Sequence, residues 1–274
     1  MKPLLTPRDL ADAIGVSESS LKRWADAGRL EVTRTEGGHR RIAVTEAVRF
    51  VRASGATVVR PDLLGLPRAG KRRGGDALIE LMERGDARGV RAAVVGRFVA
   101  GEQMATMADG SLAPALERLR AIGQHDARGA FVERRGVDAL GQALAAVRGM
   151  IELPAGAPVA VGGGRGDVAA VASLLVATVL AAEGLEAVDL GAGTSPAMVR
   201  QAVREQRPVM VWLVGPMGEP GERGGEISAL GRAVREAGGT LVVIGEGVTE
   251  RDVYRVRSYG EVAAFAKGVA SQRR

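Results

Sequence analysis

The chain has 274 residues, 46% of them hydrophobic and none of them cysteine, so it can build more than one core but no disulfide, thiolate zinc site or cysteine nucleophile. No apolar run approaches the roughly 18–20 residues of a membrane helix, and the first residues lack the apolar core of a signal peptide, so we expect a cytoplasmic protein with no membrane partner. The formal net charge is +6, and residues 1–73 hold 15 Lys and Arg against 8 Asp and Glu; this excess favours a polyphosphate partner, although a solvated basic surface has the same composition.

Two short helices are predicted at the front of the chain. Thr6 and Asp9 have the spacing of a capping box, which favours a helix that ends before Gly15. Ser17 is placed to cap a second helix over Glu18–Ala27. Two short helices joined by a glycine-containing turn are typical of helix-turn-helix DNA-binding domains.

A β-hairpin and a third helix are predicted next. The β-prone stretches 30–35 and 39–44 flank the pair Gly37–Gly38, which favours a hairpin, the wing of a winged helix-turn-helix. Thr45 is placed to cap a third helix over Glu46–Ala53.

In such a domain, residues 1–55 here, the second helix reaches base edges and the wing holds phosphates. We therefore expect DNA contacts from short polar and basic side chains of both elements. They are Ser19, Ser20, Lys22 and Arg23 on the helix, and Arg34, Thr35, Gly38, His39, Arg40 and Arg41 on the hairpin. Trp24 lies on the apolar face of its helix and is expected in the core.

The middle of the chain changes in texture. Residues 56–76 are rich in proline, glycine and basic residues, and we interpret them as a linker. Residues 77–152 show helical periodicity with little β signal and predict a four-helix bundle. The predicted helices cover about 77–82, 90–100, 112–122 and 137–151.

Residues 156–274 alternate buried strands with amphipathic helices, which predicts a doubly wound, five-stranded parallel sheet. The predicted strands are 158–161, 187–190, 209–214, 241–244 and a short one near 256. The predicted helices are 167–182, 196–205, 227–237 and 261–270.

A glycine-rich run, 162–166, is expected between the first strand of this sheet and its helix. Backbone N–H groups at Gly163 and Gly164, the charge of Arg165 and the helix dipole are suited to an anion such as phosphate. The run lacks the third glycine of the dinucleotide fingerprint, and such turns also occur without a ligand. Whether this run binds an unknown small ligand is therefore left open by the sequence.

The front of the chain resembles MerR-type regulators over residues 5–52, most specifically in Arg-Thr-Glu-Gly-Gly-His-Arg-Arg-Ile at 34–42. This resemblance implies that the second helix enters the major groove of double-stranded promoter DNA and that the wing grips the backbone. MerR-type proteins usually dimerise through a long C-terminal helix. No such heptad run follows residue 55, so we expect a homo-oligomer to form through the C-terminal half.

The order of front domain, bundle and parallel sheet resembles cobalamin-dependent light-sensing repressors of the CarH and LitR type, as do short stretches at 80–86 and 180–196. The resemblance implies a cobalamin-binding fold with a histidine below the cobalt, in the motif Asp-x-His-x-x-Gly. That motif falls on residues 167–172, where Ala169 replaces the histidine and Ala172 the glycine. An alanine methyl group cannot coordinate a metal.

Two further motifs of that family differ in this chain. The tryptophan and the Glu-His pair of its bundle would fall near Asp126 and at Gly136–Val137, and neither is present. Glu246 replaces one of a pair of glycines after the fourth strand, which puts a carboxylate at the rim of a candidate pocket with Gly163, Gly164, Arg165 and Asp167. We therefore expect no cofactor, and in particular no cobalamin.

The leading hypothesis is a transcription regulator whose degenerate rear module serves oligomerisation, contact with a protein partner or binding of an unknown ligand. The alternative is an adenosylcobalamin-dependent light-sensing repressor that uses an unusual ligand such as His125. An enzyme is not expected, because residues 157–274 contain no cysteine, no histidine and no recognisable pair of carboxylates.

Overall fold

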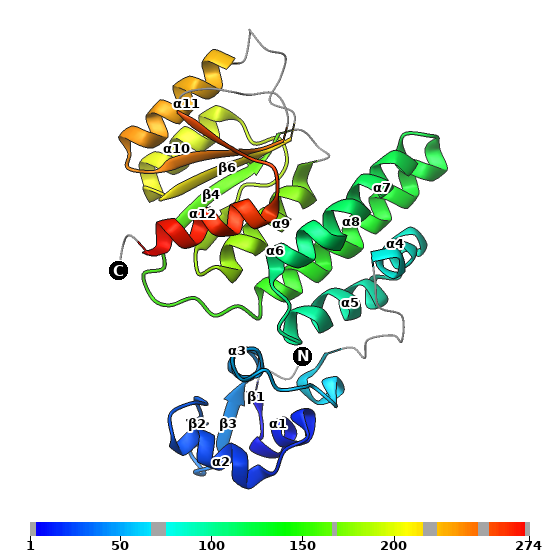
Figure 1. Ribbon diagram of the computed structural model, residues 1–274, viewed down its shortest axis with the longest axis vertical. Helices are drawn as coiled ribbons and strands as arrows, with labels where there is room; N and C mark the ends of the chain where they lie inside the picture. The colour runs from blue at the N-terminus through cyan, green and yellow to red at the C-terminus, as the bar shows by residue number, and fades with distance from the viewer. Residues whose placement is uncertain (1–3, 67–74, 166–168, 216–223, 246–251, 272–274) are drawn as a thin grey trace. The chain divides into compact units, whose positions relative to one another are not determined.

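The computed structural model (Figure 1) describes residues 4–66, 75–165, 169–215, 224–245 and 252–271. Its internal contacts divide the chain into two units. The first contains Met1–Gln103 and Pro114–Glu152, and the second contains Met104–Ala113 and Leu153–Arg274. None of the helices in the described ranges is long and apolar enough to cross a membrane.

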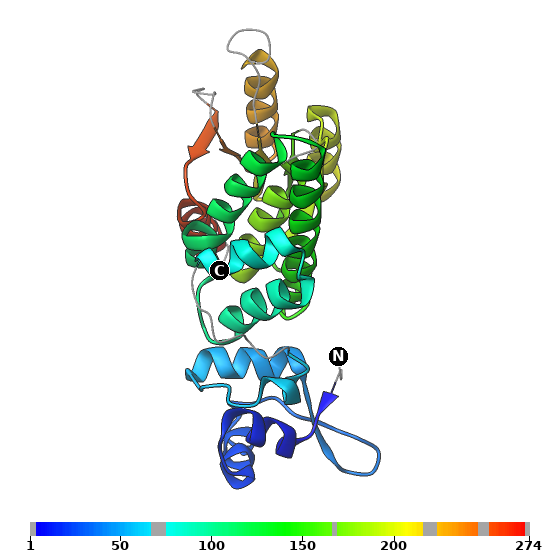
Figure 2. The same cartoon turned by 90° about the vertical axis from the view of Figure 1, so that its right-hand side faces the viewer.

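The front of the first unit, residues 4–66, is called the head. Its helices are α1 (Pro7–Ile14), α2 (Glu18–Asp26), α3 (Val44–Ser54) and the 3-10 helix η1 (Pro61–Leu64). Its strands are β1 (Leu4–Leu5), β2 (Thr33–Arg34) and β3 (Arg40–Ala43), antiparallel in the order β1-β3-β2. The hairpin of β2 and β3, called the wing, projects from the helices (Figure 2).

Local capping explains where the first two helices begin. The Thr6 hydroxyl accepts a hydrogen bond from Asp9 N (3.0 Å), and Thr6 N donates to the Asp9 carboxylate (2.9 Å), which confirms the predicted capping box. Gly15 ends α1 with a φ of 68°, in the left-handed region. The Ser17 hydroxyl then caps α2 by accepting from Ser20 N at 3.2 Å.

The rest of the first unit is helical. It contains α4 (Gly75–Arg84), α5 (Ala87–Val99), α7 (Ala113–Gly123) and α8 (Ala127–Arg148). Helix α8 packs against α4 and α5. At Gly136 the backbone of α8 also lies close to α7, so that a Cβ there would be 2.8 Å from Leu119 Cδ1. The Arg52 guanidinium of α3 lies 4.0 Å from the centroid of the Phe98 ring of α5 and donates to the Phe98 carbonyl.

The second unit is an α/β domain. Its elements are α6 (Met104–Met107), the π-helical segment η2 (Ala108–Leu112), β4 (Val159–Gly164), α9 (Ala170–Ala182), β5 (Glu186–Asp189), α10 (Pro196–Gln206), β6 (Met210–Val214), α11 (Gly224–Glu236), β7 (Thr240–Ile244), β8 (Val253–Val256) and α12 (Tyr259–Ser271). The five strands are parallel in the order β5-β4-β6-β7-β8, which confirms the predicted doubly wound sheet.

Helices cover both faces of this sheet (Figure 1). Helix α9 packs against α12, and α10 packs against α11. The core beneath α10 and α11 is entirely aliphatic. It consists of Val199, Val203, Val211, Leu213, Ile227, Leu230, Val234, Leu241 and Val243.

Several elements differ from their predicted form. Helix α3 begins at Val44 without a side-chain cap, so the prediction that Thr45 caps it is wrong. Helix α8 begins ten residues before the predicted 137, because the Asp126 carboxylate caps it by accepting from Gly129 N at 2.7 Å. The segment Met104–Ala113, which the sequence places in the bundle, groups with the α/β domain.

Candidate DNA-binding interface and the edge of the sheet

The first turn of α2 presents a row of hydroxyl and basic groups. The hydroxyl of Ser17 lies 2.8 Å from that of Ser19 and 2.9 Å from that of Ser20, and Arg23 donates to the Ser20 hydroxyl at 3.3 Å. The Ser20 hydroxyl is therefore engaged within the helix start. Ser19, Lys22 and Arg23 are exposed, as residues that contact DNA must be.

The wing is closed by a tight turn between Thr35 and His39. Thr35 N donates to the His39 carbonyl at 3.0 Å, and Gly38 N donates to the Thr35 carbonyl at 2.8 Å. Gly38 has a φ of 76°, which favours glycine at this position. Thr35, Gly38 and His39 therefore shape an exposed turn, in which the His39 N–H donates to the Thr35 hydroxyl at 3.3 Å.

The strand register divides the basic residues of the wing between its two faces. Arg34 lies directly opposite Arg40, and Thr33 lies opposite Arg41, so Arg40 and Arg41 point to opposite sides. Two guanidinium groups on one face repel each other unless an anion lies between them. Arg40 finds one such anion, because its Nη2 donates to the Asp26 carboxylate at the end of α2 (2.8 Å).

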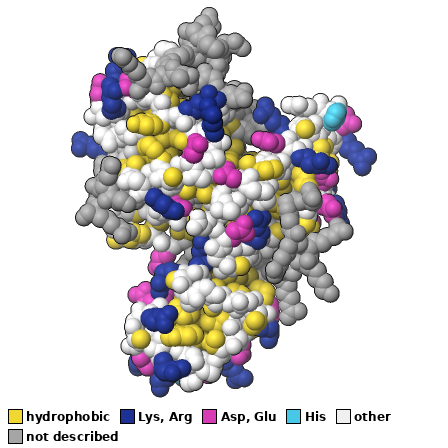
Figure 3. Space-filling model, in the orientation of Figure 1, with side chains coloured by type: hydrophobic (Ala, Val, Ile, Leu, Met, Phe, Trp, Pro, Cys, Tyr) yellow, Lys and Arg dark blue, Asp and Glu magenta, His cyan; other side chains and the backbone are white. Residues whose placement is uncertain are grey.

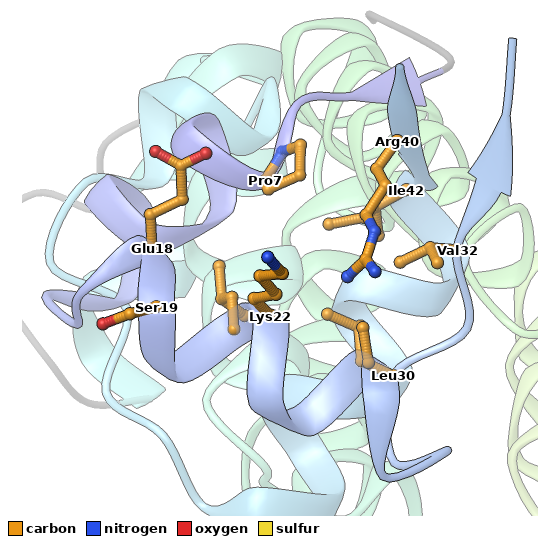
Figure 4. Close-up of a pocket in the computed structure, with 10 residues that line it drawn as sticks. Pro7, Glu18, Ser19, Lys22, Leu30, Val32, Arg40 and Ile42 are labelled. Carbon is orange, nitrogen blue, oxygen red and sulfur yellow. The ribbon is translucent and has the colours of Figure 1, made fainter. Parts of the chain in front are cut away.

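A cavity of about 260 Å³ lies between α2 and the wing (Figure 4). Lys22 of α2 and Arg40 of β3 reach toward it, whereas Ser19 lines it with its hydroxyl turned away (Figure 4). The Arg40 Nη1 is buried and has no hydrogen-bond partner among the residues that the structure describes. Its remaining lining is Pro7, Glu18, Leu21, Ala25, Leu30, Val32 and Ile42. On the face of the head seen in Figure 3, Lys and Arg side chains surround such apolar groups.

A buried carboxylate fixes the start of the wing to α3. Glu46 is 3% exposed, and its carboxylate accepts from Glu31 N at 2.7 Å and from Arg49 Nη2 at 2.6 Å. The hydrogen bond that Arg49 donates to the Glu46 carboxylate raises the pKa of Arg49 above its ordinary value. A base with a raised pKa contributes stability that is fully present below its unfolded pKa and is lost only as the pH rises through its folded pKa, so Arg49 stays charged at physiological pH.

The structure brings together only part of the predicted DNA-contacting set. Ser19, Lys22 and Arg40 share one opening, whereas Arg41 lies on the other face of the wing. Sequence reasoning missed Asp26 as the partner of Arg40. The two residues are 14 positions apart, and only the fold of the hairpin onto α2 brings them together.

At the carboxyl edge of the sheet, the structure differs from the predicted ligand pocket in where the glycines lie and in which N–H groups are available. Residues 162–164 lie inside β4 and not in the following loop. Gly164 N donates to the Gly191 carbonyl and Arg165 N to the Val214 carbonyl, both at 2.8 Å, so these N–H groups are not free for an anion. Arg165 Nη1 is buried and unpartnered among the described residues. Asp167 and Glu246 lie outside the described residues.

Close packing accounts for the glycines of β4. A Cβ on Gly162 would collide with the buried Trp212 ring of β6, and a Cβ on Gly163 would collide with Thr194. The Trp212 indole N–H donates to the Ser173 hydroxyl at 3.0 Å, and that hydroxyl donates to Asp189 at 2.7 Å. On this side of the sheet, the Trp212 ring thus fills the space beside Gly162, and the polar groups of Trp212, Ser173 and Asp189 are hydrogen-bonded to one another.

Ala169 occupies the N-cap position of α9 without a side-chain cap, where the resembled family has its metal-binding histidine. It is 7% exposed and packs against the backbones of Gly164 and Gly215. In the parts of the chain that the structure describes, no cluster of three or more His, Cys, Asp or Glu could hold a metal ion. Among the described residues, therefore, no side chain at this position could coordinate cobalt.

Known proteins resemble the two ends of the chain separately. A family of helix-turn-helix domains matches residues 4–54. No curated protein matches the chain. Among solved structures, the monomethylamine corrinoid protein of Methanosarcina barkeri is 15% identical with a TM-score of 0.50, over 70% of this chain and 96% of that protein.

Two further structures show weaker similarity. A novel cobalamin-binding protein from Desulfitobacterium hafniense DCB-2 is 17% identical with a TM-score of 0.37, over 71% of this chain and 97% of that protein. The methanol:cobalamin methyltransferase complex MtaBC from Methanosarcina barkeri is 15% identical with a TM-score of 0.36, over 93% of both chains. The chain therefore has a helix-turn-helix domain at its front and, behind it, a fold shared with a corrinoid protein.

Proposed function

We propose that the protein is a sequence-specific DNA-binding transcription regulator of the MerR type, which acts by binding and not by catalysis. The observation that carries this proposal is the opening between α2 and the wing, which is lined by Ser19 and Lys22 of α2 and by Arg40 of β3. If α2 lies in the major groove and the wing lies on the adjacent sugar-phosphate backbone, the DNA strand between the two elements passes this opening. The helix-turn-helix match over residues 4–54 supports the same role.

Binding of the full chain to the promoter of its own operon, followed by fluorescence anisotropy, tests this proposal. We expect Lys22→Ala to weaken binding roughly tenfold, because one charge-assisted contact to phosphate is lost. Arg60→Ala is the matched control. It removes the same charge from an exposed side chain in the head that pairs with Asp62 and does not line the opening. Unchanged affinity in Lys22→Ala and in the Arg40→Ala/Arg41→Ala double variant would rule out the proposed interface.

For the rear module, we propose that it binds no cobalamin and serves oligomerisation, contact with a protein or binding of an unidentified ligand. Two observations support this. Ala169 offers no lone pair to a metal, and its methyl group is packed between two glycine backbones. The Trp212 ring lies against Gly162 in the interior of the sheet, beside a fully satisfied Ser173.

Incubation with adenosylcobalamin in the dark, followed by desalting and a visible spectrum, tests cobalamin independence. We expect no retained chromophore. A retained, light-sensitive chromophore would contradict the proposal and favour the photosensor alternative. In that case His125, exposed in the turn between α7 and α8, is the candidate ligand, and His125→Ala would lose the chromophore.

A further inference from the structure

Helices α10 and α11 pack side by side on one face of the sheet (Figure 1). Residues of both helices line a groove of about 580 Å³. One wall carries two arginines of α10 and a third just after its end, and the floor between the helices is aliphatic. The lining residues are Arg200, Val203, Arg204, Arg207, Leu230, Ala233, Glu236 and Ala237.

The three arginines form one stripe. Arg200 and Arg204 lie four residues apart on one side of α10, and Arg207, which follows the end of this helix with a φ of 46°, lines the groove with them. Arg204 donates to the neutral Gln201 side chain at 3.0 Å. Among the described residues, Arg200 and Arg207 have no ion-pair partner, and Glu236 across the groove is not within 4.0 Å of a guanidinium nitrogen.

This concentration of positive charge does not follow from the composition of the rear half. Residues 74–274 hold 23 Lys and Arg against 24 Asp and Glu, a near balance. The groove lining holds three arginines against one carboxylate, Glu236, so it carries a local excess of positive charge that attracts a partner of the opposite sign.

The floor of the groove decides between classes of partner. Val203 and Leu230 are 6% and 0% exposed and belong to the core beneath the helices, so the apolar surface that a partner can reach comes mainly from the half-buried Ala233 and Ala237. A nucleic-acid backbone would gain no favourable contact from an aliphatic floor, because its outer surface is charged. An amphipathic protein helix with carboxylates on one side and apolar side chains on the other satisfies both the wall and the floor.

We propose that the groove between α10 and α11 binds an acidic amphipathic segment of a partner protein. Its carboxylates pair with Arg200, Arg204 and Arg207, and its apolar side chains fill the space above Val203. This interaction surface is separate from the DNA-binding opening of the head, so either can fail without the other.

Fluorescence anisotropy of the full chain with a labelled 16-residue helical peptide of Glu and Leu tests the proposal. We expect saturable binding that Arg204→Glu weakens at least tenfold. Ala233→Trp, which fills the groove but leaves every charge in place, should weaken it similarly. The control is Arg232→Glu, an exposed charge reversal on α11 outside the groove lining, which should bind as the unchanged protein does. A Lys and Leu peptide of the same pattern should not bind.

Far-UV circular dichroism and thermal melting verify that each variant is folded. Equal binding of the acidic and basic peptides, or unchanged binding in both Arg204→Glu and Ala233→Trp, overturns the proposal. If Arg204→Glu instead weakens binding to duplex DNA, the stripe is a nucleic-acid surface. If it instead converts an oligomer to a monomer without affecting the peptide, a second copy occupies the groove. Both of these results also overturn the proposal.

Discussion

Two neighbouring glycines in the turn of the wing, Gly37 and Gly38, differ in whether their backbone conformation favours glycine. Gly38 has a φ of 76°, whereas Gly37 has no such constraint, and a Cβ on it would make an ordinary 3.5 Å contact with the His39 ring. We expect Gly38→Ala to destabilise the turn by about 1 kcal/mol, because L-residues are strained in the left-handed region. It should also weaken DNA binding, since the turn positions Arg34 and Arg40.

Gly37→Ala is the matched control for this prediction and should leave both properties unchanged. Thermal melting and binding to the promoter duplex measure the two effects. Equal loss in both variants would show that the turn tolerates no side chain at all, and that the left-handed conformation of Gly38 is not the cause.

At this scale the sequence predicts the type of residue better than its contacts. The Thr6 and Ser17 caps could be identified because a cap joins residues only three positions apart. The pairing of Arg40 with Asp26 could not, because it depends on how the hairpin folds back on α2. Arg40 therefore lines the opening as a side chain that Asp26 holds in place through one of its nitrogens, and its contact with DNA stays a prediction.

At the scale of elements, one carboxylate joins a helical segment to the α/β domain. Asp109 of η2 accepts hydrogen bonds from Tyr259 N and Gly260 N, both at 2.8 Å, at the start of α12. We expect Asp109→Ala to lower the stability of this domain by about 1–2 kcal/mol, because two N–H groups at a helix N-terminus lose a charged acceptor.

Urea unfolding followed by the fluorescence of Trp212, with Trp24, the other tryptophan of the chain, replaced by Phe, measures this loss in the α/β domain. Glu117→Ala is the control, since it removes an exposed carboxylate of α7 for which the structure shows no partner among the described residues. Loss of stability in the control of the same size as in Asp109→Ala would refute the capping role.

Regular elements could be predicted where periodicity and capping agree, as in α1, α2, α10 and the strands of the parallel sheet. Two kinds of element escaped prediction. Strand β1 has only two residues and exists because Leu4 and Leu5 pair with β3, which is a tertiary contact. The glycines of β4 suggested a loop, because nothing in the local sequence shows that Trp212 lies against them.

At the scale of the molecule, the charges of the chain are divided between its halves, and the salt dependence of DNA binding should reflect that division. Residues 1–73 carry the whole positive excess. If the head makes roughly four to six phosphate contacts, affinity should fall roughly 10²–10³-fold between 50 and 200 mM salt. Lys22→Ala and Arg34→Ala should each lower the slope of log K against log salt by about 1.

Arg204→Glu provides the decisive comparison, because it changes the charge of the chain more than either head variant does. If the head alone holds the DNA, the slope should be unchanged in Arg204→Glu, and net charge by itself should not predict affinity. Titrations of the promoter duplex at several salt concentrations measure these slopes. A slope that follows the net charge of the whole chain, whichever half carries the substitution, would mean that binding depends on the general field of the protein and not on contacts placed by α2 and the wing.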